Sequence, residues 1–329
     1  MERQVIDMVY TFESCFAHRI ETFIAQKNAL GFNYLESSRI LRDFDRFCMT
    51  HFPTTASLTE EICMAWATKK NTEGNNTFRN RLMPIRELAR YLNRNGESAY
   101  ILPTDLVKKD SPCVPYIYTE PEILKIWDAL DTMKPRKGFP IRHYVIPAMI
   151  KLMYCCGLRP SEARKLCTKD MDLSKGRINI LESKRHRSRI VMMADNVTEM
   201  LTDYNNKVSS FMPEHYPFFP NSNGEFYGKV GIEKTFHKAL NKAGIAGAGQ
   251  HAPRLYDFRH TFATHRLYRW MQEGKDLHAM LPYLSAYMGH AQLSDTYYYI
   301  HLVPGLLKEL SGFDFSAAES LLPEVEKYE

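Results

Sequence analysis

The chain has 329 residues, of which 44% are hydrophobic and 25% are charged, and its formal net charge is +5. This length exceeds the usual size of one domain, and no apolar run is long enough to cross a bilayer, so we expect two domains and no membrane partner. The seven cysteines include no Cys-x-x-Cys pair and no carboxylate cluster has ligand-like spacing, so we expect reduced thiols, a cytoplasmic location and no metal or other cofactor.

The first third of the chain is predicted to be helical, because apolar residues recur there at helical spacing. The expected helices are residues 5–30, 34–51, 59–68 and 77–93. In the last of these, Arg79, Arg86 and Arg90 share a side away from the apolar residues. This side is either a solvated helix face or a surface that binds phosphate.

A charged and proline-bearing segment, residues 108–115, marks the predicted domain boundary. Beyond it, Thr119 and Glu122 have the spacing of a capping box that opens a new helix. We therefore expect a helical domain over residues 1–110, a linker over 111–117, and a second domain over 118–329 with a tail from about 303.

Two arginines are predicted near the starts of helices in the second domain. Arg159 follows an apolar helix that Gly157 should end, and Pro160 suits the first turn of the next helix. Glu162 follows at a spacing that can orient or neutralise Arg159. Arg259 lies near the start of a later helix, whose buried stripe is Phe262, Ala263, Leu267 and Trp270.

Between these arginines, residues 177–182 and 189–193 are predicted as two strands joined by a densely cationic turn. The turn carries Lys184, Arg185 and Arg187. It is either a solvated turn or a contact for phosphate, and its place between the two arginines favours phosphate.

His290 and Tyr299 lie nine residues apart, which would put them on opposite faces of one continuous helix. Ser294 and Asp295 are preferred N-cap residues. We therefore expect a helix that ends near Gly289, a turn that displays His290, and a new helix that carries Tyr299. A tyrosine beside a histidine can act as a nucleophile toward phosphate.

In their order and separations, from Gly157 to His301, these motifs resemble the tyrosine recombinase (phage integrase) family. The matching positions are Arg159 in Gly-Leu-Arg-Pro-Ser-Glu, Lys184 on the hairpin, Arg259 in Phe-Arg-His-Thr-Phe-Ala-Thr-His, His290 in Met-Gly-His, and Tyr299. The resemblance implies a mainly α fold with a small antiparallel β-sheet. A helical N-terminal core-binding domain would clamp DNA, and a tyrosine-recombinase catalytic domain would follow it.

The resemblance also implies a site-specific recombinase that cuts and rejoins double-stranded DNA. Tyr299 would attack a DNA phosphorus and form a 3′-phosphotyrosyl link, while Arg159 and Arg259 would bind the non-bridging oxygens. Lys184 would protonate the departing 5′-oxygen, and His290 would hydrogen-bond the phosphate or assist the tyrosine. The residues implied to contact DNA are Arg79, Arg86, Arg90, Arg185 and Arg187.

One position departs from the family pattern, because the residue three before Arg259 is usually histidine and here is Tyr256. A phenol can donate a hydrogen bond to phosphate, but with an ordinary pKa of about 10 it is a poor base at neutral pH. We expect Tyr256 and Glu162 to be accessory residues at the phosphate site. The histidines that we interpret as packing or helix-surface residues are His260, His265 and His301.

Two other classes of function stay open. A type IB topoisomerase-like enzyme would use the same nucleophile but relax DNA without joining two sites, and a DNA-binding protein with decayed catalysis would use none of it. The intact motif residues argue against decay, whereas Tyr256 argues mildly for it. We expect a recombinase of a mobile element that acts on the bacterial nucleoid as a tetramer on two DNA sites, with companion recombinases as optional partners.

The tail from Leu306 onward carries an apolar set too large to leave exposed on a monomer, interleaved with acidic residues. It either packs on its own catalytic domain or, as the resemblance implies, docks onto a neighbouring protomer.

Overall fold

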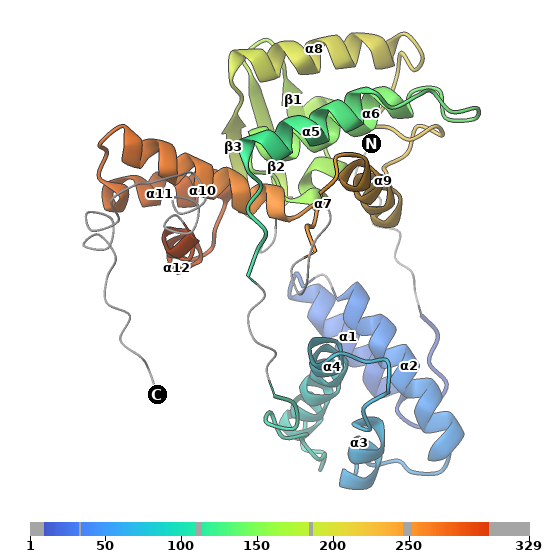
Figure 1. Ribbon diagram of the computed structural model, residues 1–329. Helices are drawn as coiled ribbons and strands as arrows, with labels where there is room; N and C mark the ends of the chain where they lie inside the picture. The colour runs from blue at the N-terminus through green and yellow to red at the C-terminus, as the bar shows by residue number, and fades with distance from the viewer. Residues whose placement is uncertain (1–9, 33, 109–113, 184–186, 246–251, 303–329) are drawn as a thin grey trace. The chain divides into compact units, whose positions relative to one another are not determined.

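The computed structural model describes residues 10–32, 34–108, 114–183, 187–245 and 252–302. The chain divides into two compact units, Met1–Pro112 and Cys113–Glu329, and each unit has its own buried apolar core. Within the described residues the fold is mainly helical with one three-stranded antiparallel sheet (Figure 1), which confirms the predicted fold class. None of the helices described is both long and apolar enough to span a membrane.

The described residues of the first unit form four helices, and α4 packs against α1 and α2 while α3 packs against α2. Their bounds are α1 Ala17–Ala29, α2 Leu35–His51, α3 Glu60–Trp66 and α4 Asn75–Arg94. The predicted first helix is wrong at its start, because residues 10–16 are not helical. The buried Asp45 carboxylate accepts hydrogen bonds from the backbone N–H groups of Glu13 (2.8 Å) and Ser14 (3.1 Å), so this segment is tied to α2 instead.

The three α4 arginines do not share an exposed face. Arg79 is half-buried and Arg90 is exposed, but Arg86 is only 8% exposed. Its guanidinium donates hydrogen bonds to the carbonyl oxygens of Leu102 (2.9 Å) and Pro103. Arg86 stays close enough to Arg79 and Arg90 to feel their charges, as the spacing predicts, but its side chain is buried and anchors the segment that follows α4.

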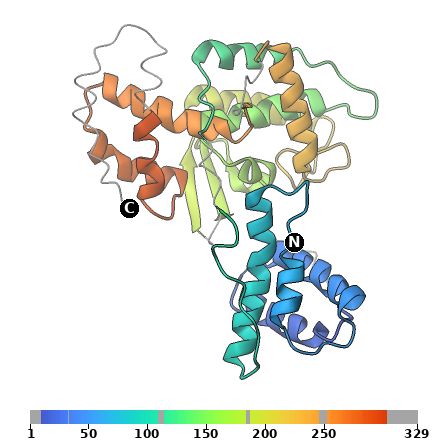
Figure 2. The same ribbon diagram turned by 60° about the horizontal axis from the view of Figure 1, so that its bottom comes forward.

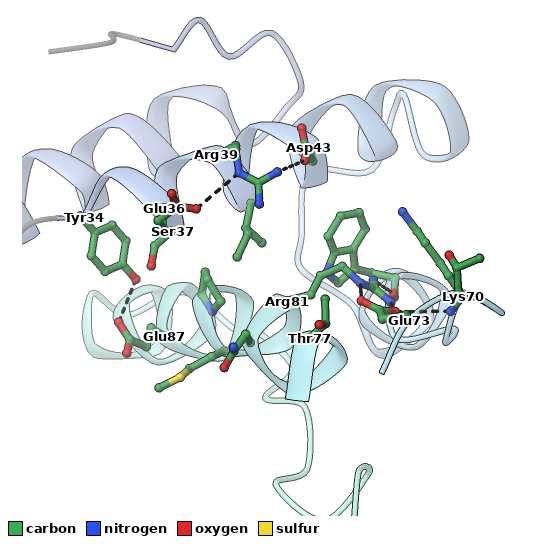
Figure 3. Close-up of a pocket in the computed structure, with 16 residues that line it drawn as sticks. Tyr34, Glu36, Ser37, Arg39, Asp43, Lys70, Glu73, Thr77, Arg81 and Glu87 are labelled. Carbon is green, nitrogen blue, oxygen red and sulfur yellow. Dashed lines mark hydrogen bonds and ion pairs between the residues drawn. The ribbon is translucent and has the colours of Figure 1, made fainter. Parts of the chain in front are cut away.

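A hollow of about 690 Å³ in the first unit is lined by α2, α4 and the segment that follows α3 (Figure 3). Its arginines are already paired with acids. Arg39 lies 3.6 Å from Glu36 and 3.8 Å from Asp43, and Arg81 donates two hydrogen bonds of 2.8 Å to Glu73. The acids that line the hollow thus offset the charges of these two arginines.

The second unit opens with the predicted capping box, since Thr119 and Glu122 exchange the two hydrogen bonds that define it. The helices and strands that follow are α5 Glu120–Asp131, α6 Arg142–Cys155, α7 Pro160–Arg164, η1 Thr168–Asp170, β1 Met171–Asp172, β2 Arg177–Ser183, β3 Arg187–Met192, α8 Asp195–Ser209, α9 Lys229–Lys242, α10 Asp257–Gln272, α11 Leu277–Met288, α12 Ser294–Tyr297 and η2 Ile300–Leu302.

Helix α6 is the centre of this unit, because it is apolar on most sides and packs against α5, α8 and α10. The strand order is β1-β2-β3, and Ile178 pairs with Val191 while Ile180 pairs with Arg189. In both views α10 to α12 (orange to red) lie beside the sheet, and α11 contacts β3 (Figures 1 and 2). This packing brings the start of α7, the strand β3 and the end of α11 together.

Candidate active site

Arg159 lies at the junction of α6 and α7, as the sequence predicts. Gly157 turns the chain there with φ 59°, and a Cβ at this position would lie 2.4 Å from the Phe262 ring. Arg159 is the N-cap residue of α7, and its backbone N–H donates to Glu162 Oε2 (2.9 Å). Its guanidinium donates to Glu162 Oε1 (2.6 Å) and to the Gly289 carbonyl (3.2 Å). The side chain is thus fixed at both ends.

Arg259 is the largest fully buried side chain among the described residues, with 1% of its surface exposed. It lies near the start of α10 and donates to the carbonyl oxygens of Gly157 (2.7 Å) and Met288 (2.6 Å). Its Nε is buried and has no partner among the described residues. Burial and the nearby Arg159 charge lower the pKa of this guanidinium. Arg259 therefore joins the ends of α6 and α11, and its guanidinium has further N–H groups that no described residue accepts from.

Arg189 is a site residue that the sequence interpretation missed. From β3 it donates two hydrogen bonds of 2.9 Å to the two oxygens of Glu162, and a third of 2.8 Å to the Tyr287 carbonyl. One signal was available: Arg189 occupies the same strand face as the buried Val191, and a charge at an inward position indicates a buried ion pair.

The Glu162 carboxylate serves two arginines at once. Burial alone would raise its pKa, but the hydrogen bonds and charges of Arg189 and Arg159 outweigh burial and lower the pKa to about 2. Glu162 is therefore ionised at neutral pH. Arg159 and Arg189 contact this carboxylate, and Arg259 lies close enough to feel its charge and that of Arg159. Three guanidinium groups and one carboxylate leave the cluster with a positive charge.

His290 is displayed by a turn that begins at Gly289, as predicted. Gly289 ends α11 with φ 66°, and a Cβ there would lie 2.9 Å from Arg189 Cδ. The His290 Nδ1 lies 2.7 Å from Thr296 Oγ1, which fixes the ring. Thr296 is fully buried, so its hydroxyl positions His290 from below the surface.

Tyr299 lies beside His290 but not on a new helix, so that part of the prediction is wrong. The helix α12 ends at Tyr297, and no side-chain hydrogen bond caps its start. Beyond it the backbone N–H of Tyr299 donates to the Thr296 carbonyl (3.0 Å), and that of Leu302 donates to the Tyr299 carbonyl (3.1 Å). These i to i+3 bonds tighten the chain into a 3₁₀ turn. The rings of Tyr299 and His290 are nearly parallel, with centroids 5.9 Å apart.

A cleft of about 620 Å³ brings four of the predicted site residues together, Arg159, Tyr256, His290 and Tyr299, whereas Arg259 and Glu162 do not line it. The side chains that line it are Arg159, Tyr256, His260, His290, Ala291, Ser294, Asp295, Tyr298 and Tyr299, together with Gly289. Lys184 and Arg185 lie outside the described residues, and Arg187 is the first residue of β3. His260 packs as expected, but it also faces this cleft, which the sequence interpretation did not anticipate.

The nucleophile candidate and its neighbour are both uncharged at neutral pH. Burial raises the pKa of Tyr299 to about 12, against the opposing charges of Arg259 and Arg159. Burial and these same two arginines lower the pKa of His290 to about 4. The cleft can therefore bind an anion beside a tyrosine, but the tyrosine must give up its proton before it can attack. No group of three or more potential metal ligands occurs among the described residues.

Comparison with known proteins gives consistent matches. Residues 117–304 match the model of the phage integrase family. The chain is 30% identical over 302 residues to y4rB of Sinorhizobium fredii, which is named as an integrase/recombinase, and this match covers 90% of the chain and 96% of y4rB. It is 27% identical to the tyrosine recombinase XerD of Vibrio cholerae over 75% of the chain and 76% of XerD.

Two solved structures share the fold. The recombinase XerH bound to its palindromic difH substrate has a TM-score of 0.60 with 20% identity, over 88% of this chain and 82% of XerH. The Tn1549 transposon integrase in complex with transposon right-end DNA has a TM-score of 0.59 with 16% identity, over 92% and 97% of the two chains.

Proposed function

Because this chain belongs to the phage integrase family, whose tyrosine recombinases cleave and religate DNA, we propose that Tyr299 is the nucleophile of a site-specific recombinase. Its hydroxyl attacks a DNA phosphorus, forms a 3′-phosphotyrosyl link and releases a 5′-hydroxyl that can later reverse the reaction on another strand. The observation that supports this is the positive arginine cluster that adjoins the Tyr299 cleft. A cleft built this way favours a phosphodiester next to the tyrosine.

The two arginines at helix junctions bind the non-bridging oxygens as charge builds on them. Arg159 faces the cleft directly, and Arg259 uses two donors on carbonyls, which leaves further N–H groups of its fork for phosphate. His290 hydrogen-bonds the phosphate from the other side, and Glu162 keeps Arg159 in place. We assign protonation of the departing 5′-oxygen to Lys184 on the resemblance alone.

The first unit supplies the DNA clamp in this proposal, with Arg79 and Arg90 as phosphate contacts, and Arg185 and Arg187 of the hairpin add two more. Substituting Arg79 and Arg90 together with Ala should flatten the dependence of log K on log salt by about 2, because each neutralised phosphate contributes roughly 0.9 to the slope. Cleavage-site choice should not change. The measurement is a filter-binding or anisotropy titration at several salt concentrations.

Arg39 provides the control for this experiment, because its guanidinium already lies near Glu36 and Asp43 in the hollow of Figure 3. Its Ala variant should keep the wild-type slope. An unchanged slope in the Arg79 and Arg90 variant would return that surface to a solvated helix face.

We further propose a tetramer that pairs two DNA sites, with residues 303–329 docked on a neighbouring protomer, and a bacterial mobile element as the setting. Those residues lie outside the described part of the chain, and support comes from the apolar composition of the tail and the integrase/recombinase name of y4rB. Companion recombinases and a nucleoid location in the bacterial cytoplasm belong to the same proposal. Inverted repeats in the DNA that flanks the gene would support a mobile element.

A two-site assay separates recombination from its alternatives. Wild-type protein should exchange strands between two copies of its site on one plasmid and leave products of defined new connectivity, which gel electrophoresis resolves. A topoisomerase-like enzyme would relax a supercoiled plasmid that lacks the site and give no recombinant product. A protein with decayed catalysis would bind DNA and do neither.

A further inference from the structure

His260 lies between the proposed nucleophile and the residue that departs from the family pattern. It is one helical turn beyond Tyr256, with ring centroids 5.1 Å apart, and its ring centroid is 5.6 Å from that of Tyr299. All three residues line the same cleft. The chemistry described above gives His260 no task.

The Nδ1 atom of His260 is buried and has no hydrogen-bond partner among the described residues. Buried polar atoms in folded proteins are nearly always paired, and an exception in a cleft indicates a catalytic role or a ligand. Two other histidines of this unit have their Nδ1 engaged: that of His290 lies 2.7 Å from Thr296 Oγ1, and that of His265 lies 3.0 Å from the Tyr154 hydroxyl. His143 Nδ1 is also buried without a partner among the described residues, but His143 does not line the cleft, whereas His260 does.

Attack by Tyr299 requires a proton acceptor, and position 256, where the family pattern has an imidazole, holds a phenol in this chain. We infer that His260 accepts the Tyr299 proton and so takes the role that Tyr256 cannot fill. The inference rests on the proposed recombinase function.

In the proposed step, each bond that forms is matched by one that breaks, and each proton has a donor and an acceptor. The Tyr299 O–H bond breaks and its proton passes to a ring nitrogen of His260, while the oxygen forms a bond to phosphorus and the bond from phosphorus to the 5′-oxygen breaks. The departing oxygen takes its proton from the general acid, which we assign to Lys184. When the strand is rejoined, the 5′-hydroxyl gives its proton back to Lys184 as its oxygen bonds to phosphorus, the bond from phosphorus to Tyr299 breaks, and Tyr299 recovers its proton from His260.

The charges around His260 keep it in the accepting form. Burial lowers its pKa to about 4, Arg254 and Arg259 act in the same direction, and Asp257 opposes them. From the cleft it also faces Arg159, His290, Asp295 and the phenols Tyr256, Tyr298 and Tyr299. A phosphodiester in the cleft adds a negative charge that favours the imidazolium, so the base strengthens when DNA binds. Without DNA, Tyr299 keeps its proton.

Two variants test this step. His260→Phe keeps a ring between Tyr256 and Tyr299 and removes both nitrogens, and His260→Gln keeps hydrogen-bonding ability without basicity. His265→Phe is the matched control, since it removes a half-buried histidine of the same helix that does not line the cleft. The substrate is selected first: the wild-type chain is incubated with a pool of nicked duplexes whose arms have random sequence, and the duplexes that it captures covalently are recovered. One captured duplex is then used to measure the rate of adduct formation by each variant in single turnover.

Both His260 variants should bind the captured duplex normally and form adduct about 10² to 10⁴ times more slowly, the usual range for a lost general base. Their rates should rise about tenfold per pH unit across pH 6–9, because attack then depends on the small phenolate fraction. The wild type and His265→Phe should be flat above pH 6. Adding Tyr256→His to His260→Phe should restore at least part of the rate and the flat profile.

A duplex with a 5′-bridging sulfur at the cleaved bond separates base from acid, because a thiolate leaves without protonation. This substrate should not rescue the His260 variants. Rescue would show that His260 acts on the leaving group and would overturn the inference. It would also be overturned if the His260 variants formed adduct within about threefold of the wild-type rate and with the same flat dependence on pH. Failure of the wild-type chain to form any adduct from the pool would instead overturn the proposed function itself.

Discussion

Tyr299→Phe should abolish covalent capture completely while leaving DNA binding intact. The substitution removes the nucleophilic oxygen and keeps the ring that packs against His260 and His290. Loss of the only bond-forming atom cannot be compensated, so the expected effect is below the detection limit of the assay, beyond the 10²-fold to 10³-fold loss typical of a single removed contact. Denaturing gel electrophoresis of protein incubated with labelled suicide DNA measures the adduct.

Tyr297→Phe is the matched control, because it removes a hydroxyl two residues away and Tyr297 does not line the cleft. It should form adduct at the wild-type rate. Adduct formation by Tyr299→Phe, or its loss in Tyr297→Phe alone, would show that the nucleophile has been assigned to the wrong tyrosine.

Arg259→Lys should slow cleavage by roughly 10³-fold or more even though it keeps the positive charge. An ammonium group has one nitrogen and cannot donate to the Gly157 and Met288 carbonyls and to a phosphate in the geometry of a planar fork. Loss of one transition-state contact lowers the rate of cleavage by about 10²-fold to 10³-fold. The carbonyls left without a donor should also shift the ends of α6 and α11 and lower the rate further. Single-turnover adduct formation measures the rate, and thermal unfolding reports the structural part.

Arg266→Lys supplies the comparison on the same helix, since Arg266 lies over the Phe262 ring and outside the cleft. It should cleave within about twofold of wild type, as a surface substitution away from the reacting atoms does. If Arg259→Lys also cleaved at nearly the wild-type rate, charge alone would be sufficient and the fork geometry would not matter.

The sequence predicted the parts of the site that depend on local backbone chemistry. Gly157 and Gly289 end helices where expected, and Arg159 caps the next helix with Glu162 as its partner. Helix-ending glycines and capping residues act over a few positions, so their effects can be recognised in a short motif.

Predictions failed where a contact distant in sequence decides the structure. Arg86 has helical spacing that places it with Arg79 and Arg90, yet the carbonyls of the 102–103 segment bind it. Arg189 joins Glu162 across 27 positions. Tyr299 is a different case, because the bond from its backbone N–H to the Thr296 carbonyl is local and forms a 3₁₀ turn where the preceding N-cap residues suggested a helix. The spacing of residues within one helix or strand does not show which residue of another segment will contact it.

Gly157 and Gly289 are two positions of the site where substitution should be poorly tolerated. Each has φ near 60°, each lacks room for a Cβ, and each offers its carbonyl to one of the two arginines, Gly157 to Arg259 and Gly289 to Arg159. In a library of all single substitutions these two positions would therefore tolerate as little as the reacting residues do, although neither glycine has a side chain to take part in chemistry. A survey of mutational tolerance would count them as part of the active site, although their role is to hold Arg259 and Arg159 in position through their carbonyl groups.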